Sequence, residues 1–185
     1  DLEASNQNLK VALNALNRAL EPNRETGQNP FFIIRRESMY TLNPAAQVCL
    51  DSEDFLSLAS GDQADDLKAA LKIYQGDYLP DATGEDWTGQ TRERLRDTYL
   101  MAANKLAARY LDDEKYDETM RICHEILMVD AYNEPAYRNL MRCHSARGNQ
   151  AAVHSLYQRC VNVMKEDLDA PPAPETTELY KHLTQ

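Results

Sequence analysis

The apolar positions of this chain recur with a helical period almost throughout. The first apolar stripe consists of Leu9, Leu13, Leu16 and Leu20. These leucines are spaced four, three and four residues apart, which is the spacing of one face of an α-helix. We expect a helix that is capped by Ser5 or Asn6 and runs to about residue 20, because Pro22 cannot continue it.

One short segment departs from the helical period. Residues 31–42 read FFIIRRESMYTL and are rich in β-branched and aromatic side chains. They predict two strands, 31–36 and 39–42, joined by a tight turn. A two-stranded hairpin with so little core is not stable alone, so we expect it to pack on the preceding helix.

From Asp51 onward strand signals are absent and the pattern is helical again. Helices are predicted from Asp51, over 63–74 and over 85–111. The long third helix carries an apolar stripe that starts at Trp87, and we interpret this Trp as a core anchor. Gly76 is expected as the residue just past the end of the second helix.

The second half of the chain contains an internal repeat. A shift of 34 residues aligns Leu106 with Leu140 and Ile126 with Cys160, and it also aligns the turns 113–115 and 147–149. A 34-residue period is that of tetratricopeptide repeats, in which helical hairpins bury their apolar faces by stacking. The sequence therefore predicts a mostly α protein: a tetratricopeptide-like stack, or α-solenoid, with an N-terminal helix and β-hairpin. The Pro-rich segment 169–183 is expected to end in a short helix, capped by Thr176 or Thr177, that covers the last repeat.

The net charge of −10 is unevenly distributed. Residues 1–50 carry equal numbers of basic and acidic side chains, so the whole excess of acid lies in residues 51–185. A segment that meets phosphate is therefore expected only in the first quarter of the chain. No apolar run is long enough to span a membrane and no signal peptide is visible. The cysteines give no sign of a disulfide framework, which favours a reduced cytoplasmic setting.

The sequence shows no motif for catalysis, cofactor binding or metal binding. The four cysteines (49, 123, 143, 160) form no CxxC pair, and the four histidines form no cluster with them. No Gly-rich phosphate loop and no arrangement of a nucleophile with a base is visible. We therefore expect no metal site, no cofactor and no enzymatic activity.

The polar face of the first helix is the candidate nucleic-acid surface. It presents short amides and cations: Lys10, Asn14, Asn17 and Arg18. Such side chains suit base edges and phosphates in a major groove. Arg35 and Arg36, at the turn end of the hairpin, suit a minor groove or phosphates. Taken alone, these residues are more simply explained as a solvated surface helix and two surface arginines.

Two family resemblances extend this interpretation. The helix 5–20 followed by FFIIRRESMYTLNP resembles the recognition helix and wing of a response-regulator-type (OmpR-like) winged helix-turn-helix, with Met39 where that family has Gly. LKIYQGDYLP, EDWTGQTRERLRDTYL, the repeat pair and the PETTELY end resemble, in that order, the bacterial transcriptional activation domain of SARP-type regulators. The resemblances imply a partial DNA-binding domain at 1–46 and a helical activation domain at 47–185.

These resemblances also imply partners. A winged helix reads promoter DNA, and the helical domain mediates contacts with RNA polymerase or a second copy of the chain. The earlier helices of a winged helix are not in this sequence, so we expect a fragment of a longer regulator that binds DNA poorly alone. Its leucine stripe would then be uncovered, and we expect it to be covered by a second copy of the chain or by the repeat domain.

The alternative is a tetratricopeptide-type adaptor that mediates protein–protein contacts without binding DNA. Tyr137, Arg138 and Arg142 lie on the first helix of a repeat and could line a partner-binding surface. The same residues are also explained as a core Tyr and two surface cations, and this explanation is the favoured one.

Overall fold

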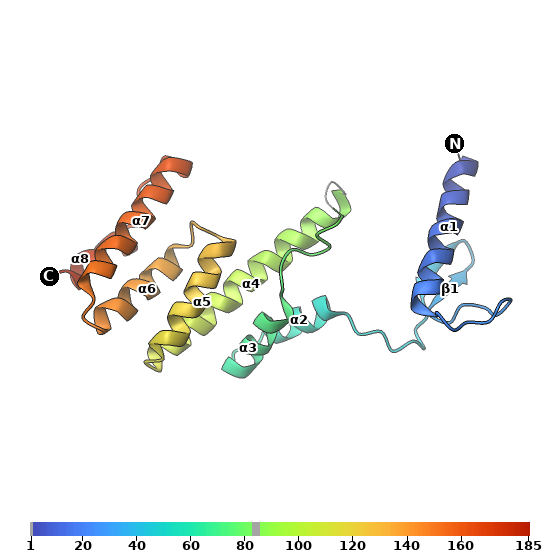
Figure 1. Cartoon of the computed structure of the whole chain (residues 1–185), viewed down its shortest axis with the longest axis horizontal. Coiled ribbons are helices and arrows are strands. Elements are labelled where there is room, and N and C mark those ends of the chain that lie inside the picture. Colours follow the sequence, from blue (N-terminus) through green and yellow to red (C-terminus); the bar gives the residue numbers. More distant parts are fainter. Residues whose placement is uncertain (1, 83–85) are drawn as a thin grey trace. The chain divides into compact units, whose positions relative to one another are not determined.

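The structure is a computed structural model that describes residues 2–82 and 86–185. The chain divides into two compact units, Asp1–Cys49 (unit 1) and Leu50–Gln185 (unit 2). Figure 1 shows unit 1 as one helix with a small β-hairpin and unit 2 as a succession of helices. The predicted class, mostly α with stacked helical hairpins and one β-hairpin, is confirmed.

Unit 1 contains helix α1 (Leu2–Leu20) and the antiparallel strands β1 (Ile33–Arg36) and β2 (Met39–Leu42). The hairpin register pairs Arg36 with Met39 across the two-residue turn 37–38. The helix begins three residues before the expected cap at Ser5, because the preceding Leu, Glu and Ala are good helix formers and extend it. Ser5 and Asn6 are therefore helical residues and not caps.

The hairpin is tied to the end of α1 by one carboxylate. Glu21 accepts hydrogen bonds from the backbone amides of Phe31 and Phe32 at 2.8 and 3.2 Å. The Asn43 side chain donates to the Phe31 carbonyl at 2.8 Å and so holds the other end of the hairpin. These bonds place helix and hairpin in one unit, as the sequence predicted.

In unit 2, helices α2 (Asp51–Ala59), α3 (Ala64–Ile73) and α4 (Asp86–Asp112) share an aromatic core. The Tyr74 ring lies 5.6 Å from the Phe55 ring and stacks on Tyr99 at 4.5 Å. Helix α3 ends at Ile73 with Tyr74 as its C-cap, so Gly76, with φ of +140°, lies one residue beyond the expected position.

The interpretation of Trp87 as a core anchor is wrong. Its side chain is 64% exposed, whereas Thr88 is buried. The buried face of α4 includes Leu95, and seven residues back along a helix from Leu95 is Thr88, on the same face. The sequence stripe was therefore placed one residue too early at the start of this helix.

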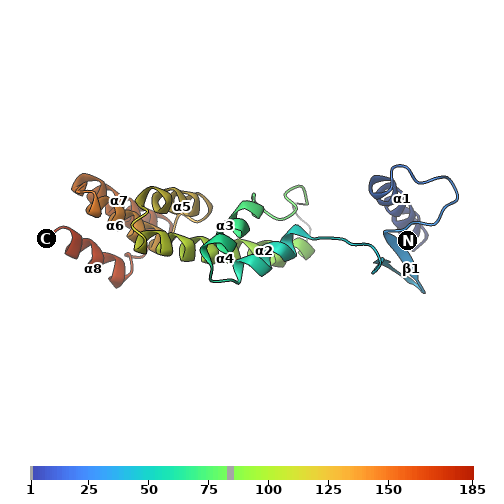
Figure 2. The ribbon, with the colours of Figure 1, turned by 90° about the horizontal axis from the view of Figure 1, so that it is seen from below.

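The 34-residue repeat is visible in the helix boundaries. Helix α4 ends at Asp112 and α5 (Tyr116–Val129) begins four residues later. The same boundaries recur 34 residues on, where α6 (Glu134–Ala146) ends and α7 (Gln150–Leu168) begins. Figures 1 and 2 both show α4 to α7 following one another side by side.

The last helix, α8 (Pro174–Leu183), packs against α6 and α7. Tyr180 stacks on Tyr157 of α7 with ring centroids 3.9 Å apart, and Arg138 of α6 donates to the Thr176 hydroxyl at 2.8 Å. The helix begins at Pro174, so Thr176 is a buried side chain of its first turn and not the expected cap. Pro is well suited to this first position.

Candidate functional site

The candidate nucleic-acid surface in unit 1 consists of two polar groups. Lys10, Asn14 and Arg18 of α1 are all exposed, and their spacing of four residues places them in one row along the helix. Side chains in such a row can contact successive positions along a groove. The structure thus brings together three of the four predicted helix residues in an accessible place.

Asn17 differs from the other three. Its side chain is only 6% exposed, and its amide oxygen lacks a hydrogen-bond partner among the described residues. Leu13 and Asn17 lie on one side of the helix, where Leu13 is half-buried and Asn17 buried. In this conformation Asn17 faces the interior of unit 1 and is not available to a DNA base. The sequence pattern could not reveal this, because Asn is usually a surface residue.

The second polar group lies at the end of the hairpin. Arg35 and Arg36 are both exposed on β1, next to the turn. The Arg35 side chain donates to the Glu37 carbonyl at 3.1 Å, and Glu37 has a left-handed backbone with φ of 54°. The turn thus orients the Arg35 side chain, and both arginines remain exposed.

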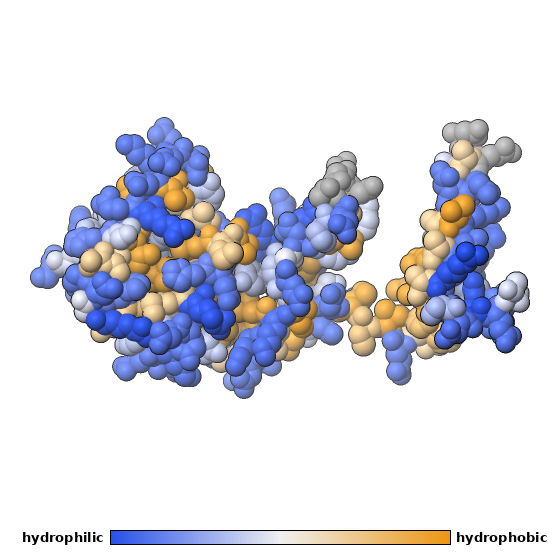
Figure 3. Space-filling model, viewed as in Figure 1, coloured by the Kyte–Doolittle hydropathy of each residue, from blue (hydrophilic) through white to orange (hydrophobic). Residues whose placement is uncertain are grey.

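The leucine stripe of α1 is largely uncovered. Leu9, Leu16 and Leu20 are 48%, 46% and 41% exposed, and only Leu13 is half-buried. Figure 3 shows this apolar surface along one side of the helix. Among residues 4–49, only Asn17 and Ile33 are buried, so unit 1 has a very small core.

The predicted partner-binding residues on α6 occupy three different environments. Tyr137 is fully buried in the core of unit 2, and burial raises its pKa. Arg138 is engaged by Thr176 of α8, and Arg142 is exposed. Tyr137 is therefore not available to a partner, because helix packing on both sides covers its ring. Of the three, only Arg142 remains freely accessible.

Three of the four cysteines behave as small apolar side chains rather than as reactive groups. Cys123, Cys143 and Cys160 are buried, and burial raises the pKa of Cys123 to about 12 and that of Cys160 to about 11. Cys49 is exposed. Among the described residues, no three His, Cys, Asp or Glu side chains lie close enough together to hold a metal ion. Within the same residues, no helix has both the length and the apolar character needed to cross a lipid bilayer.

Two hollows in unit 2 had no counterpart in the sequence analysis. One, of about 810 Å³, lies beside α2 and the segment 72–80. The other, of about 230 Å³, is lined by side chains of α3, α4 and α5. Hollows formed by three helices depend on how the helices pack, and a linear pattern carries no signal for them.

Comparison with known proteins identifies the helical part. A family model described as "Bacterial transcriptional activator domain" matches residues 55–184. A solved structure, Mycobacterium tuberculosis EmbR in complex with a low-affinity phosphopeptide, is similar with a TM-score of 0.73 and 17% sequence identity. The similarity covers 97% of this chain and 49% of the EmbR chain, so this chain spans about half the length of EmbR. No curated protein matches.

The two findings carry different weight. The likeness to EmbR, at 17% identity, shows a common fold and nothing more specific. The family model matches most of the chain and includes all of the α3–α8 succession. The chain belongs to the bacterial transcriptional activator domain family.

Proposed function

We propose that this chain is part of a transcriptional regulator in which unit 1 contributes to promoter binding and unit 2 mediates regulatory protein contacts. Unit 1 would be the recognition helix and wing of a winged helix. The proposal divides the chain into a DNA-binding part at 1–46 and an activation domain at 47–185. The family match of residues 55–184 supports the transcriptional role.

The observation that carries the DNA-binding part is the charge distribution of unit 1. Three exposed side chains form a row on α1 (Lys10, Asn14, Arg18), and two exposed arginines (Arg35, Arg36) stand beside the hairpin turn. The Glu21 hydrogen bonds hold helix and hairpin in one unit, and the proposal requires both groups to face one duplex. Major-groove contacts by a helix with phosphate or minor-groove contacts by a hairpin form a common reading mode.

The partner contacts proposed for unit 2 are with RNA polymerase or with a second copy of the chain. The exposed Arg142 on α6 is the remaining candidate contact of the three predicted there. Self-association would use unit 1 as well, because the uncovered leucines of α1 form an exposed apolar stripe of the kind that usually marks a contact surface.

The DNA-binding proposal is tested with the protein as its gene encodes it. A duplex is first selected from a random library with the unsubstituted protein, and its affinity is measured by fluorescence anisotropy over a range of salt concentrations. We expect K10E/R18E and R35E/R36E each to weaken binding at least tenfold and to reduce the salt dependence. Each lost phosphate contact should lower the slope of log K against log salt by about 0.9.

The matched control is R94E/K165E, which makes the same charge change at two exposed positions of unit 2. It should leave the affinity and the salt slope close to those of the unsubstituted protein. Unchanged DNA binding in both unit-1 variants, with folding intact by circular dichroism, would overturn the role proposed for unit 1. Failure of the unsubstituted protein to select any duplex would instead favour the adaptor that does not bind DNA.

A further inference from the structure

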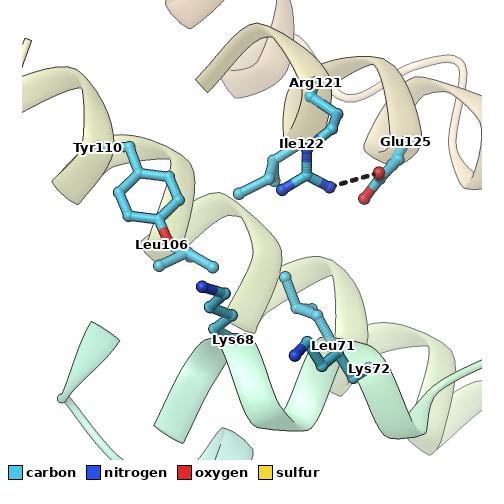
Figure 4. A pocket seen from close by; sticks show the side chains of 8 residues that line it. All are labelled: Lys68, Leu71, Lys72, Leu106, Tyr110, Arg121, Ile122 and Glu125. Atoms are coloured by element: carbon cyan, nitrogen blue, oxygen red, sulfur yellow. Dashed lines mark hydrogen bonds and ion pairs between the residues drawn. The ribbon is translucent and has the colours of Figure 1, made fainter. Parts of the chain in front are cut away.

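A hollow of about 230 Å³ lies where α3, α4 and α5 meet in unit 2. Its lining residues are Lys68, Leu71, Lys72, Leu106, Tyr110, Arg121, Ile122 and Glu125. Figure 4 shows Lys68 and Arg121 reaching toward the same space from α3 and α5. Side chains that are 53 positions apart in the sequence therefore share one small site.

The charge of this hollow is opposite to that of the chain. Three cations line it, against the single carboxylate of Glu125, whereas the chain as a whole carries −10. Arg121 is paired with Glu125 at 2.8 Å. Within the described residues, neither Lys68 nor Lys72 takes part in a salt bridge. Two lysines without carboxylate partners, in an acidic protein, form a local excess of positive charge.

The floor of the hollow is apolar. Leu106 and Ile122 are each only 1% exposed, and the Tyr110 ring lies beside them. The floor lies beneath cations that are themselves exposed, with the Arg121 side chain 60% exposed, so water partly screens their attraction for an entering anion. The floor itself offers an apolar surface to a small organic group that is attached to the anion.

We propose that this hollow binds a small organic anion of the phosphomonoester class. A phosphate ester carries about −1.5 to −2 charges at neutral pH. This charge matches the two lysines better than the single charge of a carboxylate ligand would. Arg121 can add hydrogen bonds from its planar guanidinium, which suits phosphate oxygens. A volume of about 230 Å³ is small for a ligand pocket and favours a compact ligand over a peptide.

The charge of Glu125 provides a second test of the proposed anion site. Its carboxylate repels an entering anion and holds the Arg121 guanidinium at 2.8 Å. Removing that charge should therefore strengthen binding, whereas removing a lysine charge should weaken it. A purely structural role of the lysines, whose stems can cover apolar surface, would produce no such opposite pair of effects.

The test is a titration of the full ¹⁵N-labelled chain with phenyl phosphate at constant ionic strength, followed by NMR. We expect saturable shifts of amides in α3 and α5, a loss of at least tenfold in affinity for K68Q/K72Q, and a gain of about threefold for E125Q. The control K165Q/K181Q removes two exposed lysine charges of α7 and α8 and should leave the affinity unchanged.

Phenol and benzoate separate the contributions of shape and charge. Weaker binding of both than of phenyl phosphate supports the phosphomonoester class, and equal binding of benzoate overturns it. Absent or unsaturable shifts overturn the proposal, as does equal loss of affinity in the control variant. An acidic peptide that displaces phenyl phosphate and binds at least tenfold more tightly would assign the hollow to a protein partner instead. Melting temperatures of all variants confirm that each one is folded.

Discussion

At the C-terminal end of α1, the carboxylate of Glu21 accepts hydrogen bonds from the amides of Phe31 and Phe32. No helical or strand bond satisfies these two amides, because Phe31 and Phe32 precede β1. A carboxylate is a stronger acceptor than a neutral group, so this one side chain fixes where the hairpin starts.

We expect Glu21→Ala to destabilise the hairpin by about 1 kcal/mol, because two charge-assisted hydrogen bonds are lost at a partly exposed site. Hydrogen exchange of the Phe31 and Phe32 amides, followed by NMR, measures this directly and should become several-fold faster. Glu21→Gln keeps an acceptor oxygen and should show a smaller change. Equal exchange rates in all three proteins would mean that these bonds do not hold the hairpin.

Other single residues show the limit of sequence patterns. Asn17 and Trp87 both occupy positions opposite to their usual preference, with Asn17 buried and Trp87 exposed. Residue type predicts burial only on average, and the neighbouring elements decide each case.

At the scale of elements, the two repeated hairpins share a backbone feature that their sequences hide. Glu114 and Gly148 occupy equivalent positions, 34 residues apart, and both have left-handed backbones with φ of 59° and 70°. The turn geometry is therefore repeated although one copy uses Gly and the other Glu. The geometry of the turn recurs because the two flanking helix boundaries recur.

We expect Gly148→Ala to lower the free energy of unfolding by about 1 kcal/mol, because a side chain is disfavoured at this φ. No atom lies within 4 Å of an added Cβ, so the effect is one of the backbone alone. Glu114→Gly should change the free energy of unfolding by less than about 0.5 kcal/mol. The substitution relieves the backbone strain at this φ, but Gly also loses more chain entropy on folding, and the two effects oppose each other. Urea unfolding followed by circular dichroism provides the values.

Gly89→Ala is the matched control for these turn variants. Gly89 is exposed in α4, and an added Cβ would meet nothing within 4 Å. At this position Ala should raise the free energy of unfolding by up to about 1 kcal/mol, because Gly is a poor helix former. Destabilisation at both glycines would show that packing, and not φ, determines the cost at Gly148.

At the scale of the whole molecule, the two units differ in how much they bury. Only two side chains are buried among residues 4–49, whereas unit 2 has a continuous core that extends from α2 to α7. Local stability follows the burial of apolar contacts, so the two units should open independently and at different free energies.

We expect amides of α1 to exchange with solvent at least a hundredfold faster than amides of 95–107 in α4, as measured by hydrogen–deuterium exchange mass spectrometry. The reason is that α1 leaves Leu9, Leu16 and Leu20 exposed, while α4 is covered along its buried face. Equal protection of both helices would contradict the independence of unit 1. Protection of α1 that rises with protein concentration would indicate a homodimer through the leucines.

The predicted site residues agree with the structure where helical spacing decides their exposure and differ from it where packing between helices decides it. Lys10, Asn14 and Arg18 are exposed as their place on the helical period implies, and so are Arg35 and Arg36. Tyr137 is core and Arg138 is engaged by α8, because helices from elsewhere in the chain pack around them. The hollow beside Lys68 and Arg121 was not predictable, since its walls come from three helices.

The sequence by itself determined the local structure: the helical periods, the hairpin at residues 31–42, and the 34-residue repeat with its turns. Proline, β-branched residues and apolar spacing act over a few residues, so their effects can be read along the chain. Only the tertiary structure decided which side of each helix is covered. Burial depends on neighbours that are distant in the sequence, and Asn17, Trp87 and Tyr137 have their environments from such neighbours.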